Sequence, residues 1–322
     1  MPRAESAKAV TTGRPVPPHA QAEPTWRRRG GFFLDGTWDR ATGTTVGAAW
    51  VQWEAPADAA GRREPVVLVH GGGGQATDWM WAADGRPGWA EHFVAAGHPT
   101  YLIDRTGYGR SVWDARTMGE RDPVPPTSLL AGLFQLDETD VRPGPDSRFA
   151  AVGASSTGLL VDSDAAQRRD ADHLIALMER IGPGILVSHS AGAPSVWLAA
   201  DTRPDLVVAI VAVEPLGPPY GGERHGRAMS AGLTAFPLSG GLAQVPVLLL
   251  TAAASGHRDA DRGTAAFLRE LGAPVEHVEL DRDGTHGDGH GVIFGRGSTA
   301  SFHLVHAWCA DVPRRKATHD QL

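Results

Sequence analysis

The stretch ILVSHSAGAPSVWLAA, residues 185–200, constrains the fold of this chain more than any other. It begins with an apolar run, passes through a short polar turn and ends in an alanine-rich helical pattern. This order predicts a strand, a tight turn and a helix. In a nucleophile elbow, such a turn lifts one side chain clear of the sheet and leaves the next N–H free at the start of the helix. Ser190 occupies the raised position, and Ala191 follows it.

The elbow differs slightly from the usual pattern G-x-S-x-G. Ser188 stands where the first glycine is expected, and Gly192 supplies the second. A serine in front of a helix also serves commonly as an N-cap, so the motif alone leaves a structural interpretation open. Other motifs along the chain favour the catalytic interpretation.

A glycine-rich loop comes directly after a predicted buried strand. The apolar residues 66–69 are followed by His70 and by four consecutive glycines, 71–74. Successive glycines let backbone N–H groups converge on one point, as the donors of an oxyanion hole do. A phosphate-binding loop is disfavoured, because the expected Lys-Ser/Thr ending is absent. We therefore expect the N–H groups of Gly72 and Ala191 to form an oxyanion hole.

Three carboxylates compete to orient a catalytic histidine. The predicted strand 206–213 ends in Glu214, and a proline that stops strand pairing follows it. The carboxyl ends of parallel strands meet at the ligand-binding edge of the sheet, so Glu214 is expected near Ser190. Asp259 and Asp261 come after the next strand, where many hydrolases of this architecture place the acid. Their polar surroundings also suit a solvated helix start.

The last predicted strand leads into a glycine-rich loop, residues 281–291, that contains two histidines. A histidine on this loop can reach the elbow, and its ordinary pKa suits a general base at neutral pH. His286 and His290 compete for this role. In an alternative interpretation, His286, Asp288 and His290 lie on one face of the loop and bind a metal ion. That interpretation is weaker, because it leaves the elbow unexplained.

The chain alternates between strand and helix patterns after an initial antiparallel pair, residues 31–34 and 46–53. This alternation predicts an α/β fold with a doubly wound, mostly parallel sheet and helices on both faces. The expected strands are 65–70, 100–103, 185–187, 206–213, 245–250 and 275–280; the expected helices are 79–96, 165–181, 194–201, 264–271 and 299–309.

The domain organisation follows from the segments that break this alternation. Residues 1–25 have the composition of a disordered tail, and residues 26–322 are expected to form a single domain. Two segments rich in proline and glycine, at about 114–163 and 215–244, interrupt the pattern. Long loops after the carboxyl ends of strands commonly serve as lids or pocket walls, so we expect lid-like insertions here.

Composition narrows the functional classes. The net charge is -7 and no basic stripe is present, so nucleic acid is not an expected partner. The single cysteine, Cys309, excludes an internal disulfide framework and a cysteine-based metal site. No apolar run is long enough to span a bilayer, and no secretory signal is evident near the start. The sequence therefore predicts a cytoplasmic protein without membrane contact.

Taken together, the order glycine loop, serine, acid and histidine matches the chain order of α/β-hydrolases. More narrowly, the segments GFFLDG, HGGGGQATDW, SHSAG, VEPLGPP and GTHGDGHGVIF resemble a bacterial esterase family in which a glutamate after the strand following the elbow is the acid. The resemblance implies Glu214 as the acid and His290, in a G-N-x-H-like loop, as the base. The chain departs from that pattern where Asp288 replaces the asparagine and at residues 217–219.

The resemblance implies a carboxylic ester hydrolase that forms an acyl-enzyme on Ser190, without a metal or another cofactor. The expected partner is a small-molecule ester, and the sequence leaves open whether the chain forms a homodimer.

Two alternatives to ester hydrolysis remain. One is a lactonase or carbon–carbon bond hydrolase with the same triad, and the other is a ligand-binding protein of this fold with little turnover. The substrate-binding residues are unknown at this level, although Trp79, Trp81, Trp113 and Phe134 are candidates for an apolar pocket.

Overall fold

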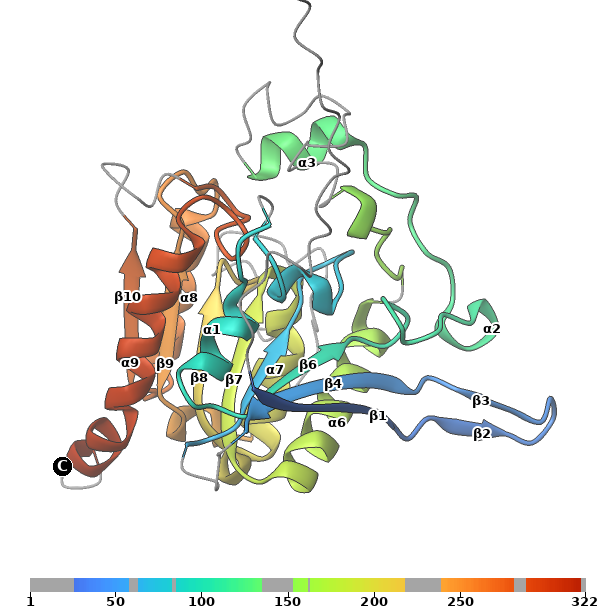
Figure 1. Cartoon of the computed structure of the whole chain (residues 1–322), viewed down its shortest axis with the longest axis horizontal. Coiled ribbons are helices and arrows are strands. Elements are labelled where there is room, and N and C mark those ends of the chain that lie inside the picture. The colour runs from blue at the N-terminus through green and yellow to red at the C-terminus, as the bar shows by residue number, and fades with distance from the viewer. Residues whose placement is uncertain are drawn as a thin grey trace, which may run out of the picture.

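The computed structural model describes residues 26–57, 63–82, 85–134, 153–161, 163–217, 239–280 and 288–319. Its centre is an eight-stranded sheet (Figure 1). In spatial order, the strands are β1 (Arg27–Leu34), β4 (Ala49–Pro56), β6 (Thr100–Asp104), β5 (Val66–Val69), β7 (Gly184–His189), β8 (Val207–Val213), β9 (Val247–Thr251) and β10 (Val275–Glu279).

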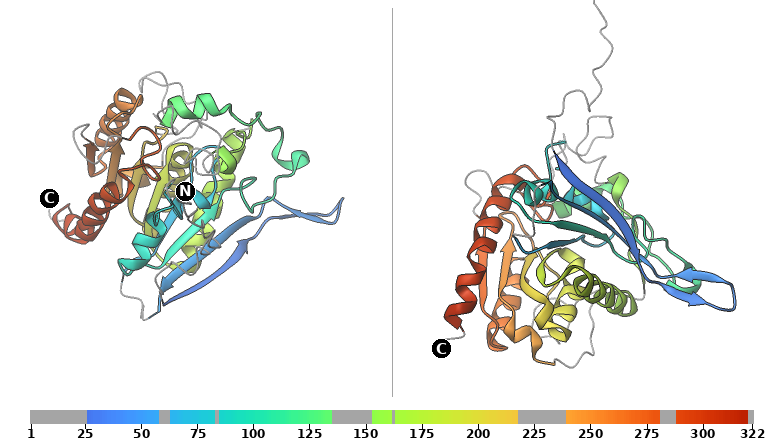
Figure 2. Two further views of the ribbon diagram at one scale, coloured as in Figure 1. Left: turned by 45° about the horizontal axis from the view of Figure 1, so that its top comes forward. Right: turned by 60° about the horizontal axis from the view of Figure 1, so that its bottom comes forward.

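The sheet is parallel except at one edge. β4 runs antiparallel to both of its neighbours, β1 and β6, and every pair from β6 to β10 is parallel. The predicted antiparallel edge pair and the mostly parallel sheet are thus confirmed. Between β1 and β4, the short strands β2 (Thr37–Asp39) and β3 (Thr44–Val46) form a hairpin that projects from the body (Figures 1 and 2).

Helices cover both faces of the sheet. α6 (Ser163–Ile181), α7 (Ala193–Thr202) and α8 (Arg258–Glu270) pack on one face, and α1 (Trp89–Ala95) and α9 (Ser298–His319) pack on the other. The position of β5 explains why its sequence is apolar throughout. Val67 and Val69 face the first group of helices, and Val66 and Leu68 face the second. A strand covered on both faces has no polar side.

Several helix bounds differ from the sequence prediction. The expected helix 79–96 is confined to α1, preceded by a 3-10 turn, η2 (Ala76–Trp79). Gly85 has a left-handed backbone, and Pro87 and Gly88 come directly before α1, so the helical pattern cannot continue through this region. α8 begins earlier than expected and α9 ends later.

The described part of the first insertion contains α2 (Ala115–Met118), α3 (Thr127–Phe134) and the segment 153–161. Figure 1 shows α3 above the carboxyl-terminal edge of the sheet. The segment 153–161 is fastened to the body, since the N–H of Thr157 donates to the carbonyl of Gly73 at 2.7 Å and the N–H of Leu160 donates to the Tyr108 hydroxyl at 3.0 Å.

In the second insertion, only residues 215–217 and 239–244 are described, including η6 (Gly241–Gln244). The predicted tail, residues 1–25, lies outside the described residues. The division into a tail and one domain with two insertions remains a prediction. None of the helices in the described ranges is long and apolar enough to cross a membrane.

Candidate active site

The predicted elbow has the expected form. β7 ends at His189, and Ser190 begins a 3-10 turn, η3 (Ser190–Gly192), that leads into α7. Ser190 has φ 51°, a left-handed conformation that side-chain-bearing residues rarely adopt. Gly192 has to be small, because a Cβ there would lie 2.5 Å from the carbonyl oxygen of His70. Ser190 remains partly exposed between buried neighbours, so the turn presents one hydroxyl to the surface.

Glu214 leaves the adjacent strand, β8, in a similar conformation, with φ 48°. Its side chain is fully buried, and polar groups surround both carboxylate oxygens. Oε1 accepts a hydrogen bond from the N–H of Ala252 at 2.5 Å, and Oε2 accepts one from the Ser255 hydroxyl at 2.7 Å. A buried carboxylate is tolerated when its lone pairs are used in this way.

His290 connects the two residues. Its Nε2 lies 2.8 Å from Ser190 Oγ, and its Nδ1 lies 3.1 Å from Glu214 Oε2. The tautomer that fits both contacts carries the proton on Nδ1, where it is donated to the carboxylate, and leaves Nε2 to accept from the serine hydroxyl. The structure therefore brings together the three residues that the sequence singled out as nucleophile, base and acid.

The two rival acids lie elsewhere. The Asp259 side chain is 98% exposed and faces Arg262. Asp261 is buried, and its Oδ2 accepts from the Thr251 hydroxyl at 2.7 Å. The expectation of a solvated Asp261 is wrong, because α8 begins at Arg258 and turns this residue toward the sheet.

His286 lies outside the described residues. Asp288, the second residue of the alternative metal site, accepts hydrogen bonds from the N–H groups of Arg296 at 2.9 Å and Gly297 at 2.6 Å. These bonds fasten the turn that follows His290. The carboxylate thus has a structural role at the position where the related pattern has asparagine.

Two further histidines contact His290 and had no signal in the sequence. His189 is buried, and desolvation lowers its pKa to about 3, so its ring is neutral. Its Nε2 lies 2.8 Å from the main-chain carbonyl of His290, to which it donates a hydrogen bond. The ring of His257 stacks on that of His290 at a centroid distance of 4.7 Å. Sequence spacing could not reveal these contacts, because they join the end of β7 to two segments far away in the sequence.

A metal ion would compete with the triad. Glu214, His257 and His290 place one possible ligand atom each within 4.8 Å of the others. However, both ring nitrogens of His290 are engaged by Ser190 and Glu214, so binding a metal through this imidazole would break one of those contacts.

The glycine loop lies against the elbow. A Cβ on Gly72 would lie 3.1 Å from Ala191 Cβ, and a Cβ on Gly71 would lie 3.2 Å from Ser190 Cβ. The loop is held by His70, whose Nε2 accepts from the N–H of Arg105 at 2.9 Å. Burial lowers the pKa of His70 to about 4, which keeps this nitrogen free to accept.

A pocket of about 60 Å³ lies at Ser190 and His290. Of the four candidate aromatic residues, Phe134 lines it, with its ring parallel to that of His290 at 6.2 Å. The other three lie elsewhere. Trp79 is fully buried in the core, Trp81 lines a separate pocket, and Trp113 stacks against the Arg121 guanidinium at 5.0 Å.

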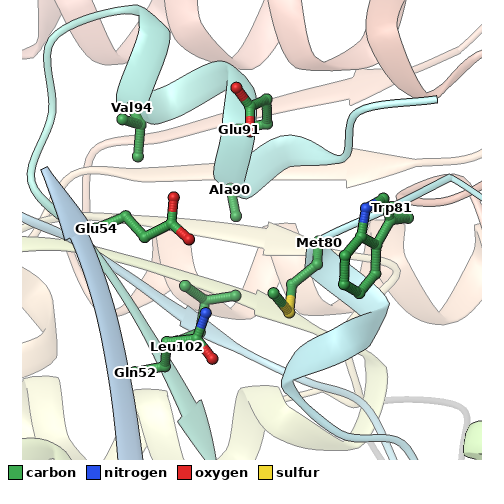
Figure 3. A pocket seen from close by; sticks show the side chains of 8 residues that line it. All are labelled: Gln52, Glu54, Met80, Trp81, Ala90, Glu91, Val94 and Leu102. Atoms are coloured by element: carbon green, nitrogen blue, oxygen red, sulfur yellow. The ribbon is translucent and has the colours of Figure 1, made fainter. Parts of the chain in front are cut away.

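The separate pocket, of about 90 Å³, lies between β4 and α1 (Figure 3). Glu54 and Glu91 approach it from these two elements, but both carboxylates pair with the guanidinium of Arg27. A larger cavity, of about 540 Å³, lies beside the β2–β3 hairpin. The lining residues described for these two cavities include no histidine or serine, whereas those of the pocket at Ser190 include both Ser190 and His290.

Comparison with known proteins finds similarity to a lipase and to esterases. No family model matches it. A probable secreted lipase of a fungal species (strain ATCC 74256) is 28% identical over 301 residues, covering 76% of this chain and 81% of the lipase. A bacterial esterase of known structure superposes with a TM-score of 0.68 at 20% identity, covering 90% of this chain and 97% of the esterase. A serine hydrolase from the bacterium Cycloclasticus zankles gives a TM-score of 0.51 at 13% identity, covering 88% and 99%.

These comparisons confirm the predicted fold, which is that of an α/β-hydrolase. They also correct one prediction. The expected cytoplasmic location is wrong, because the fungal relative is described as secreted. That expectation rested on the lack of an evident signal sequence, which is a weak basis for assigning a compartment.

Proposed function

We propose that this α/β-hydrolase-fold esterase cleaves carboxylic esters of small molecules through an acyl-enzyme intermediate, with Ser190, His290 and Glu214 as its catalytic triad. The observation that carries the proposal is the continuous chain of contacts from Ser190 Oγ through the His290 ring to Glu214, at 2.8 Å and 3.1 Å. The similarity to lipases and esterases supports the same reaction class.

In the first half of the reaction, His290 Nε2 removes the proton of Ser190 as the oxygen attacks the ester carbonyl carbon. The N–H groups of Gly72 and Ala191 stabilise the oxyanion of the tetrahedral intermediate. The intermediate collapses when His290 returns the proton to the alkoxy oxygen. The alcohol then leaves, and the acyl group remains on Ser190.

In the second half, His290 accepts a proton from water, which attacks the acyl carbon. The resulting intermediate releases the carboxylic acid as Ser190 regains its proton. Throughout, Glu214 holds the Nδ1 proton of His290 and stabilises the imidazolium that forms twice in each cycle. No step requires a metal ion or an organic cofactor.

The proposal is tested by labelling and turnover together. We expect a fluorophosphonate to react with Ser190 alone, and we expect hydrolysis of p-nitrophenyl butyrate to stop as labelling proceeds. Ser190→Ala should abolish both the label and the turnover while keeping the circular dichroism spectrum of the folded chain. A label on another residue, or saturable ester binding without sustained product release, would contradict the proposal.

A further inference from the structure

The pocket at Ser190 has two chemically different sides. One side, which we call the polar side, adjoins the glycine loop and consists of Asp78, Ser155, Ser156 and Thr157. The other, the apolar side, adjoins His290 and consists of Pro125, Leu130, Leu133, Phe134 and Phe294. Because both sides line the pocket that contains Ser190, the two halves of a bound ester can meet different surroundings.

The reaction itself decides which half of the ester faces which side. The alkoxy oxygen must receive its proton from His290 Nε2, so the alcohol half begins beside this ring. His290 is bordered by the apolar side, since Phe134 lies parallel to its ring and the carbonyl of Leu133 accepts its main-chain N–H at 3.3 Å. The alcohol half thus takes the apolar side, which leaves the polar side for the acyl half.

Asp78 is the ionisable group of the polar side. Its Oδ2 accepts a hydrogen bond from the N–H of Gln75, and its Oδ1 accepts one from the Ser155 hydroxyl, both at 3.3 Å. These contacts are long for hydrogen bonds, so the carboxyl group keeps acceptor capacity. A Cβ on Gly74 would lie 2.0 Å from Oδ2, which shows how closely the carboxyl packs against the glycine loop.

We propose that Asp78 is a specificity-determining residue that selects esters whose acyl group carries a hydroxyl, by accepting a hydrogen bond from that hydroxyl on the polar side of the pocket. This inference rests on the proposed ester hydrolysis at Ser190 and names the substrate class for it. Burial raises the pKa of Asp78 to about 7, so both of its ionisation states occur near neutral pH. A hydroxyl suits both states, because it can donate to either and can also accept from the protonated acid.

The test compares three esters with the same leaving group: p-nitrophenyl butyrate, 3-hydroxybutyrate and 3-methoxybutyrate. Each value of kcat/KM is divided by the rate of alkaline hydrolysis of the same ester, which removes differences in intrinsic reactivity. The hydroxy ester should be preferred over the methoxy ester by about twofold to tenfold, the range that one net hydrogen bond contributes. Equal hydrolysis of these two esters by the unaltered chain would overturn the inference without need of any variant.

Substitutions then assign the preference to its residue. In Asp78→Ala the ratio of the hydroxy ester to the methoxy ester should fall to about one, whereas Asp78→Asn, which keeps an acceptor oxygen, should retain most of it. Leu133→Ala is the matched control on the apolar side, and it should leave this ratio unchanged. A purely structural role of Asp78 would lower kcat/KM for all three esters equally.

The outcomes separate this inference from the proposed function. Hydrolysis of p-nitrophenyl butyrate with labelling of Ser190, but with no hydroxyl preference, would overturn the role of Asp78 and leave the ester hydrolysis intact. A preference that persists in Asp78→Ala would also overturn that role. Absence of both turnover and labelling would instead overturn the proposed function.

Discussion

Ser190 and Glu214 occupy matching positions on two neighbouring strands. The register of β7 and β8 pairs His189 with Val213. Ser190 directly follows His189, and Glu214 directly follows Val213. Within the described ranges, they are the two non-glycine residues with positive φ, at 51° and 48°. Backbone strain of this kind costs about 1–3 kcal/mol per residue and persists where the surrounding structure holds it, often at functional sites. Here it aims both side chains at the His290 ring.

The first prediction concerns the acid. Glu214→Gln should lower kcat by about four orders of magnitude, as the corresponding amide substitution does in a serine protease, because the amide disturbs the histidine tautomer. Asp259→Asn is the matched control, since its side chain is 98% exposed, and it should retain wild-type kcat. Asp261→Asn should also retain kcat but lower the melting temperature, because its carboxylate is buried and accepts from Thr251. Steady-state kinetics and thermal denaturation check these outcomes. Loss of kcat in Asp261→Asn with an unaffected Glu214→Gln would move the acid to α8.

The second prediction separates the two loop histidines. His290→Ala should lower kcat by about two to four orders of magnitude, since it removes the general base. His286→Ala should have a far smaller effect, and treatment with EDTA should leave activity unchanged. Equal losses in the two variants, or a loss with EDTA that zinc restores, would favour the alternative metal site over the triad.

Much of this site could be predicted because its signals are local. The elbow, the glycine loop and the glutamate at the end of β8 each combine a buried strand with residues that stop it, and a parallel sheet brings such strand ends to one edge. Asp261 was placed wrongly because a helix start and a polar run look alike in sequence. The contacts of His189, His257 and Asp78 depend on how segments that are far apart in the sequence pack together, and no periodic pattern encodes that.

The third prediction addresses His189, which donates from Nε2 to the main-chain carbonyl of His290. His189→Phe keeps an aromatic ring but leaves that buried carbonyl without this donor, at a cost of about 1–3 kcal/mol. We expect a lower melting temperature and slower fluorophosphonate labelling of Ser190, because the loop that carries the base loses an anchor. Labelling at the wild-type rate in a folded variant would show that this hydrogen bond does not position His290.

The fourth prediction is a pH dependence of stability caused by Asp78. Burial, as the largest cause, raises the pKa of its carboxyl in the folded chain from an ordinary value of 3.8 to about 7. The folded state therefore binds this proton more tightly than the unfolded state does. The resulting stabilisation is complete below about pH 3.8 and is lost as the pH rises through about 7.

Asp78→Asn removes this titration while keeping the shape of the side chain. Its free energy of unfolding, relative to that of the wild type, should therefore increase between pH 5 and pH 8, as measured by urea denaturation at both values. Asp259→Asn serves as the control for the substitution itself, because it makes the same change at a side chain that is 98% exposed. If the free energy of unfolding of Asp78→Asn relative to the wild type is the same at pH 5 and pH 8, the Asp78 carboxyl titrates at an ordinary pKa. In that case Asp78 would be ionised throughout the working range and would act on a substrate hydroxyl only as an acceptor.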